Sequence, residues 1–78
     1  MHNELTEVDI QKMKEELAAR KAAAPKLREA VKEARALGDL SENDEYRSAK
    51  RELGRNNSRI RYLENMIKTA IIVKTDST

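Results

Sequence analysis

The chain has 78 residues, of which 38% are charged and 3% are aromatic, and its formal net charge is +2. A chain of this length forms at most one small domain, and without cysteine it has neither disulfides nor thiolate metal sites. Two Gly, one Pro and no Phe or Trp are typical of long solvated helices and argue against an aromatic platform for stacking bases.

The small net charge does not by itself indicate a nucleic-acid-binding protein. The apolar runs are shorter than the ~20 residues that a membrane span requires, and the N-terminus lacks the pattern of a signal peptide. We therefore expect a soluble, cytoplasmic protein that does not associate with membranes.

Apolar residues recur at alternating steps of three and four in both halves of the chain, which is the a/d pattern of a coiled-coil seam. A polar residue occupies one position of each seam. The first seam consists of Ile10, Met13, Leu17, Arg20, Ala24, Leu27, Val31 and Ala34. The second consists of Tyr46, Ala49, Leu53, Asn56, Ile60, Leu63, Ile67 and Ala70.

Residues at the ends of the seams match helix-capping signals. Thr6, with Asp9 three residues later, can cap the start of the first helix. Gly38 suits the left-handed conformation that follows a helix C-terminus. Ser41, with Asp44 three residues later, is the expected N-cap of the second helix.

The short connection between these caps predicts that the helices return along each other. In that arrangement the two seams pair layer by layer, from Ala34 with Tyr46 at one end to Ile10 with Ala70 at the other. The predicted fold class is all-α, an antiparallel two-helix coiled-coil hairpin with an acidic tip. Residues 1–70 form the hairpin, with helices over about 7–37 and 42–70 and the tip at 38–41, and residues 71–78 form a tail or linker.

The middle of the hairpin combines two poorly packed layers with a proline. Pro25 removes one backbone donor and frees the carbonyl of Lys21, so we predict a kink or a soft point there. Arg20 is expected to extend its charged head to water. Asn56 either fixes the register, or bonds the freed carbonyl, or is a tolerated polar residue.

The β-branched residues of the tail, Ile71 to Val73, interrupt the heptads and predict a short strand or linker with no partner left in the chain. Either a further domain or another chain would then cover it, and self-association through the tail is one form of this.

Four carboxylates gather at the turn: Asp39, Glu42, Asp44 and Glu45. Acids in the first turn of a helix complement its dipole, which accounts for most of them, and aspartate is a common turn former. The alternative is a carboxylate pair for Mg²⁺, which prefers oxygen ligands. Two side chains on an exposed tip would need further ligands from a partner, as in two-metal phosphoryl chemistry.

The segment Ala34–Tyr46 resembles the hairpin tip of the bacterial Gre transcript-cleavage factors, most closely those of the A type. Their tip pattern is Gly-Asp-Leu, a variable residue, Glu-Asn, a variable residue and Glu-Tyr, and residues 38–46 match every fixed position. The flanking segments and the mid-helix Pro25 are similar too, so the resemblance covers nearly the whole chain.

The resemblance implies a transcription elongation factor that inserts its hairpin into the secondary channel of bacterial RNA polymerase. There it stimulates Mg²⁺-dependent hydrolysis of backtracked RNA. Carried over by position, Asp39 and Glu42 are the metal-directed, catalytic pair, and the Mg²⁺ is held jointly with the polymerase. Glu45 and Tyr46 would shape the tip. The chain would not be an enzyme, because the polymerase performs the cleavage.

Arginines recur at every fourth position of the second helix, at Arg47, Arg51, Arg55 and Arg59. Such a row follows one side of a helix and could contact phosphates of the nascent RNA or acidic walls of the channel. An ordinary solvated coiled-coil face is the alternative, since Glu45 and Glu52 dilute the row.

Members of the resembled family carry a C-terminal, FKBP-like domain that docks on the polymerase, whereas this chain ends at Thr78. Three interpretations stay open: a piece of a longer protein, a natural short form that binds more weakly, or a protein that occupies the channel without stimulating cleavage. A purely structural coiled coil that self-associates is the competing hypothesis from another functional class.

Overall fold

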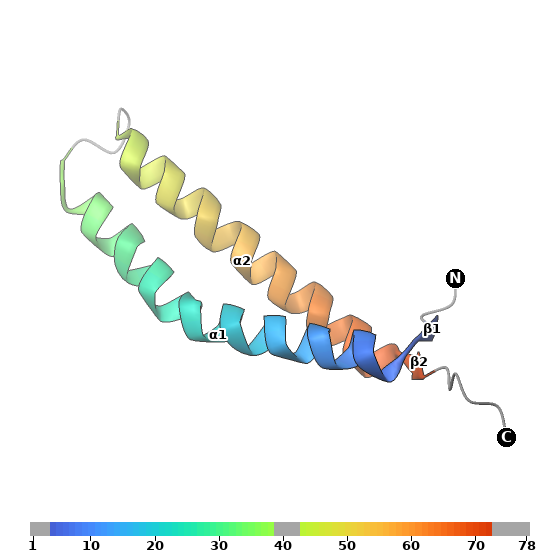
Figure 1. Ribbon diagram of the computed structural model, residues 1–78. Coiled ribbons are helices and arrows are strands. Elements are labelled where there is room, and N and C mark those ends of the chain that lie inside the picture. The colour runs from blue at the N-terminus through green and yellow to red at the C-terminus, as the bar shows by residue number, and fades with distance from the viewer. Residues whose placement is uncertain (1–3, 39–42, 73–78) are drawn as a thin grey trace, which may run out of the picture.

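In the computed structural model, which describes residues 4–38 and 43–72, two long helices lie antiparallel along a rod (Figure 1). α1 spans Glu7–Arg35 and α2 spans Asp44–Thr69. The molecule measures 63 × 24 × 14 Å. The end of α1 and the start of α2 lie together at one end of the rod, called the tip below. The predicted all-α helical hairpin is confirmed.

The predicted seams are the residues that the two helices bury against each other. Every seam position is buried or half-buried, and the positions between them are mostly exposed. Leu63 is completely buried, and Ile10, Ala24 and Ala34 are 5–8% exposed. Burial of a leucine side chain contributes roughly 1.5–3 kcal/mol, so these seams supply most of the stabilisation that a short, aromatic-poor chain can obtain.

The start of α1 is capped as predicted. The hydroxyl of Thr6 accepts a hydrogen bond from the backbone N–H of Asp9 at 3.1 Å, and the Asp9 carboxylate accepts one from the N–H of Thr6 at 3.2 Å. This reciprocal capping box satisfies two of the N–H groups that a helix start leaves unpaired.

α1 ends earlier than predicted. Its last residue is Arg35, and Ala36 is the C-cap, although the N–H of Leu37 still bonds the carbonyl of Ala34 at 3.1 Å. Gly38 has a φ of +137°, a backbone region that favours glycine, as expected for a residue that turns the chain after a helix.

α2 begins at Asp44, two residues later than predicted, and its N-cap is Asn43 rather than Ser41. The side chain of Asn43 accepts the N–H of Tyr46 at 3.0 Å. Asparagine and serine are about equally good caps, so local preference could not choose between them. Asn43 also has a second partner on α1, described below, that serine is too short to reach from the same position.

α1 continues through Pro25 without a break. Figure 1 shows α1 changing direction near its middle, while α2 is straighter. The predicted kink is therefore present. One of the three alternatives for Asn56, a bond to the carbonyl freed by Pro25, is not found: the Asn56 amide N–H donates to the carbonyl of Arg20 at 2.9 Å and not to that of Lys21.

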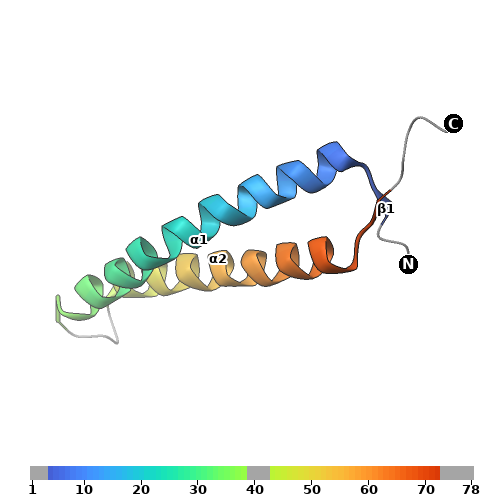
Figure 2. The ribbon, with the colours of Figure 1, turned by 90° about the horizontal axis from the view of Figure 1, so that it is seen from below.

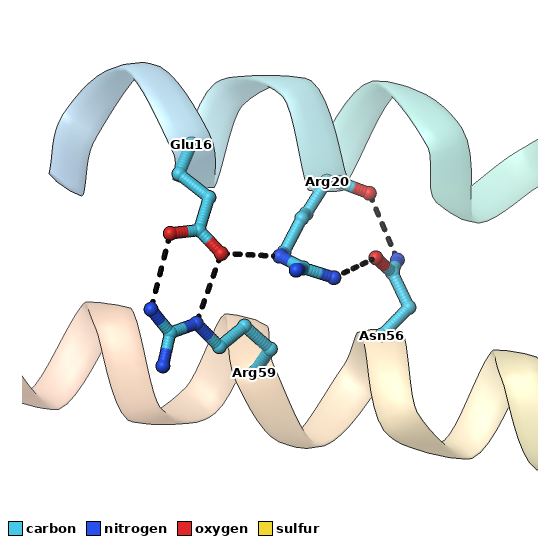
Figure 3. Close-up of polar contacts among 4 residues, drawn as sticks. All are labelled: Glu16, Arg20, Asn56 and Arg59. Atoms are coloured by element: carbon cyan, nitrogen blue, oxygen red, sulfur yellow. Dashed lines mark hydrogen bonds and ion pairs between the residues drawn. The ribbon is translucent and has the colours of Figure 1, made fainter. Parts of the chain in front are cut away.

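The prediction that Arg20 extends its charged head to water is incomplete: its side chain is 37% exposed, and the guanidinium also has two acceptors within the hairpin (Figure 3). Its Nε donates to Glu16 at 2.6 Å and its Nη1 donates to the Asn56 side-chain oxygen at 3.2 Å. Arg59 of α2 binds the same Glu16 carboxylate through two hydrogen bonds, at 2.9 and 3.1 Å. These four residues form a polar network across the middle of the hairpin.

The tail pairs within the chain, which contradicts the prediction that it had no partner left. β1, Glu4–Leu5, and β2, Ile71–Ile72, form a two-stranded parallel sheet in which Glu4 pairs with Ile71 and Leu5 with Ile72. Figure 2 shows β1 at the end of the rod opposite the tip. Residues 73–78 lie outside the described part of the chain.

Neither helix combines the length and the apolar character needed to cross a membrane.

Candidate functional site

The predicted metal-directed residues, Asp39 and Glu42, lie outside the residues that the structure describes, as do Leu40 and Ser41. The structure instead defines both flanks of this segment. Its two attachment points, the end of α1 and the start of α2, are joined by side-chain contacts that the sequence did not predict.

Asn43 connects the two helices at the tip. Its amide N–H donates to the carbonyl of Ala34 on α1 at 2.6 Å, and its amide oxygen accepts the N–H of Tyr46 on α2 at 3.0 Å. Its own carbonyl accepts the N–H of Arg47 at 3.1 Å. One half-buried side chain therefore caps α2 and holds the last turn of α1. We call this arrangement the Asn43 bridge.

Tyr46 is the half-buried residue that ends the second seam at the tip, as predicted. Two cationic side chains lie close to its aromatic ring. The Arg35 guanidinium and the Lys50 ammonium lie 5.6 and 5.2 Å from the ring centroid, and Arg35 donates a long 3.4 Å hydrogen bond to the phenol oxygen. The Arg35 hydrogen bond and the nearby Lys50 charge lower the pKa of Tyr46. Arg35 and Lys50 thus place positive charge around Tyr46 at the tip.

Two of the tip acids can be placed. Asp44 has a side chain that is 96% exposed and lies 3.9 Å from Arg47, and Glu45 is exposed as well. Both belong to the first turn of α2, where carboxylates complement the helix dipole. This supports the structural interpretation for these two residues.

No metal centre is built from the described residues, which contain no group of three or more His, Asp or Glu side chains able to hold an ion. A pair of carboxylates has the right donor chemistry for Mg²⁺, which takes about six oxygen ligands and retains water among them. Asp39 and Glu42 lie outside the described residues, so their role as a Mg²⁺ pair completed by a partner's ligands stays a prediction.

The predicted arginine row divides into two parts. Arg51 and Arg55 are exposed and make no hydrogen bond or ion pair with another described residue. Arg59 is engaged by Glu16 and lies 4.8 Å from the ring centroid of Tyr62, so it holds the hairpin together. Arg47, Arg51 and Arg55 form the part of the row nearest the tip, and this exposed part is the one that a polyanion could reach.

The two flanks of the hairpin near the tip carry opposite charge. A shallow hollow on one flank is lined by Tyr46, Arg47, Lys50 and Arg51. A shallow groove on the other flank is lined by Ala30, Glu33, Ala34, Leu37, Glu45, Ser48, Ala49 and Glu52. The positive flank would attract a phosphate backbone that lies along the rod, while the three glutamates of the other flank would repel it.

Sequence reasoning missed the Asn43 bridge and the role of Arg35. The asparagine was visible as a fixed position of the tip pattern, but its partner lies nine residues earlier on the other helix. Arg35 directly follows the seam residue Ala34, and only the three-dimensional arrangement shows that it faces Tyr46.

Comparisons with known proteins agree with the geometry. A family model described as the N-terminal part of a transcription elongation factor matches residues 3–72. The chain belongs to the Gre family of transcription elongation factors. It is 46% identical over 71 residues to transcription elongation factor GreA of Thermosipho melanesiensis and 45% identical over 71 residues to GreA of Thermotoga neapolitana. Each alignment covers 90% of this chain and 46% of the relative.

GreA of Geobacillus kaustophilus is 44% identical over 73 residues, which is 92% of this chain and 46% of that protein. The chain therefore spans about half the length of the curated Gre relatives it matches. No solved structure matches the chain at a comparable level of significance.

Proposed function

We propose that this chain is the channel-inserted arm of a transcript-cleavage factor. The hairpin enters the secondary channel of bacterial RNA polymerase with its tip foremost and brings Asp39 and Glu42 to the polymerase active site. One observation carries the proposal: the described residues of the Gre tip pattern, Gly38 and 43–46, lie at one end of a rod that measures 63 × 24 × 14 Å, and the Asn43 bridge joins the two helices there.

The shape and the chemistry support each other. Two long helices packed along one seam make a stiff carrier, and the mid-hairpin polar network ties them together at a second point. Asp39 and Glu42 would offer carboxylate oxygens at the end of this carrier. These two residues would hold Mg²⁺ jointly with the polymerase, and the ion would supply an activated water for phosphodiester hydrolysis.

Basic residues elsewhere on the chain would attract its binding partners. Arg51 on the positive flank and the exposed Arg55 further along α2 would contact phosphates of the backtracked RNA or acidic channel walls, an attraction that weakens as salt rises. The polymerase supplies the catalytic centre, so the chain stimulates a nuclease reaction and is not itself an enzyme.

The test is RNA cleavage by a stalled, backtracked bacterial RNA polymerase complex with Mg²⁺, with and without the chain. We expect stimulation by the parent and a loss of roughly 100-fold or more in Asp39→Asn/Glu42→Gln, since removing a group that supports transition-state charge stabilisation costs on the order of 10²–10³-fold. The matched control is Asp44→Asn, which removes a charge from the same tip at a variable position of the pattern and should keep most of the stimulation.

Binding without stimulation would contradict the proposal. If the parent competed for the channel but left cleavage unchanged, the chain would be a channel-blocking protein. If it neither bound the polymerase nor stimulated cleavage, a structural coiled coil would be the better description.

A further inference from the structure

The side chain of Asn43 makes two different kinds of hydrogen bond at once. It accepts from the N–H of Tyr46, which is the usual work of an N-cap, and it donates to the carbonyl of Ala34 on the opposite helix at 2.6 Å. Capping α2 requires only the acceptor. The donor is an additional property, and it acts between helices.

The acceptor of that hydrogen bond, Ala34, is held in place by its surroundings. It is a seam residue that is only 5% exposed, so its position is fixed by packing between the helices. Its carbonyl also accepts the N–H of Leu37, the last turn-like bond before the chain leaves α1. Asn43 thus attaches the start of α2 to the point where α1 ends.

The same device recurs in the middle of the hairpin. Asn56 of α2 is buried and likewise donates to an α1 backbone carbonyl, that of Arg20, at 2.9 Å. Two asparagine side chains therefore donate hydrogen bonds to the backbone of α1: Asn56 in the middle of α2, and Asn43 at its N-cap. Two such points fix both the axial register and the separation of the helices, which one point alone would not.

We propose that Asn43 is a positioning residue for the cleavage reaction. Its bridge to Ala34 sets the separation of the two helix ends between which residues 39–42 run, and so sets where Asp39 and Glu42 are presented. This inference rests on the proposed function. It is separate from the cap itself, because aspartate and serine also cap helices well yet cannot make the bridge.

The discriminating variants are Asn43→Asp and Asn43→Ser. Aspartate keeps the acceptor for Tyr46 but brings an oxygen toward the Ala34 carbonyl, while serine keeps an acceptor on a side chain too short to reach α1. Both variants retain the cap and lose one hydrogen bond, so we expect folded proteins whose melting temperatures lie only a few degrees below that of the parent.

In the cleavage reaction, the protein concentration that gives half-maximal stimulation should be the same for both variants as for the parent, because the surface of the rod that binds the polymerase is unchanged. The maximal rate at saturation should fall by about 10- to 100-fold, the range expected for displacement of catalytic groups by about 1 Å. Asp44 is next in sequence and takes no part in the bridge, so Asp44→Asn should keep the parent's maximal rate.

A measurement without polymerase checks the geometry directly. The chain has no cysteine, so spin labels can be placed at Glu33→Cys and Ser48→Cys, which line the same groove on opposite helices. We expect a narrow distance distribution in the parent and a broader or longer one in both Asn43 variants.

The outcomes separate the two proposals. Unchanged distances together with an unchanged maximal rate in both Asn43 variants would overturn the positioning role and leave the proposed function intact. Parent-like cleavage by Asp39→Asn/Glu42→Gln would overturn the proposed function and with it any role of Asn43 in cleavage. The spin-label distances would then decide separately whether Asn43 sets the helix separation.

Discussion

Glu16 shows how a single side chain can hold the hairpin together while remaining near the surface. Its carboxylate accepts hydrogen bonds from Arg59 on α2 and from Arg20 on its own helix, and its side chain is 33% exposed. The Arg59 hydrogen bonds, followed by that of Arg20, lower the pKa of Glu16 to about 2 from 4.5. The folded protein therefore keeps Glu16 ionised at pH values where the unfolded chain protonates it.

This shift predicts the pH range in which Glu16 stabilises the fold. Because the folded pKa is the lower one, the contribution is complete above about pH 4.5 and is lost as the pH falls toward 2. Glu16→Gln should lower the melting temperature by a few degrees at pH 6, and the two proteins should converge near pH 2. Glu29→Gln, an exposed acid on the same helix, serves as the control and should melt like the parent. A constant difference between parent and Glu16→Gln from pH 6 to pH 2 would contradict the pKa argument.

At the scale of the helices, patterns carried by near neighbours were predictable and contacts between distant residues were not. The seams and the Thr6 cap follow from spacing within one helix, and the structure has both. The choice of Asn43 over Ser41 depends on a carbonyl of the other helix. The pairing of Ile71 and Ile72 depends on Glu4 and Leu5 at the far end of the chain, which no local pattern connects to them.

The functional pair is a different case, because the resemblance supplied it and no composition or spacing argument did. Asp39 and Glu42 stay predictions, since they lie outside the described residues. The part of the arginine row that holds the hairpin could not be foreseen, because Arg59 differs from Arg55 only in facing a carboxylate on α1.

Asn56 allows a prediction about the stability of the helix pair. Its amide oxygen and amide nitrogen are each hydrogen-bonded, yet it occupies a seam position that is 5% exposed and that an apolar residue could fill. Replacing a buried polar group with a well-packed apolar one is often neutral or stabilising. We expect Asn56→Leu to raise the free energy of unfolding by about 1–2 kcal/mol, measured by urea denaturation, and to weaken the specification of the register.

The neighbouring Asn57 supplies the control. It is half-buried and makes no side-chain hydrogen bond with the described residues, so Asn57→Leu should change stability less. An unchanged or lower melting temperature in Asn56→Leu would show that the polar network stabilises the hairpin more than leucine packing would.

The whole molecule is a rod whose two ends differ in kind. One end joins the first and last described residues in a short parallel sheet, and the other carries the tip pattern between flanks of opposite charge. The mid-hairpin network and the Asn43 bridge connect the helices between these ends. Such a rod is suited to carrying a small chemical group over a distance, which is the function that we propose for Asp39 and Glu42.

The Mg²⁺ dependence of cleavage tests that function most directly. With the chain at saturating concentration, the Mg²⁺ concentration needed for half-maximal RNA cleavage by a backtracked polymerase should fall below that of the polymerase alone. With Asp39→Asn/Glu42→Gln it should return to the value of the polymerase alone, and Asp44→Asn should behave like the parent. Stimulation by the parent with the same Mg²⁺ dependence in all four reactions would contradict metal-directed tip carboxylates.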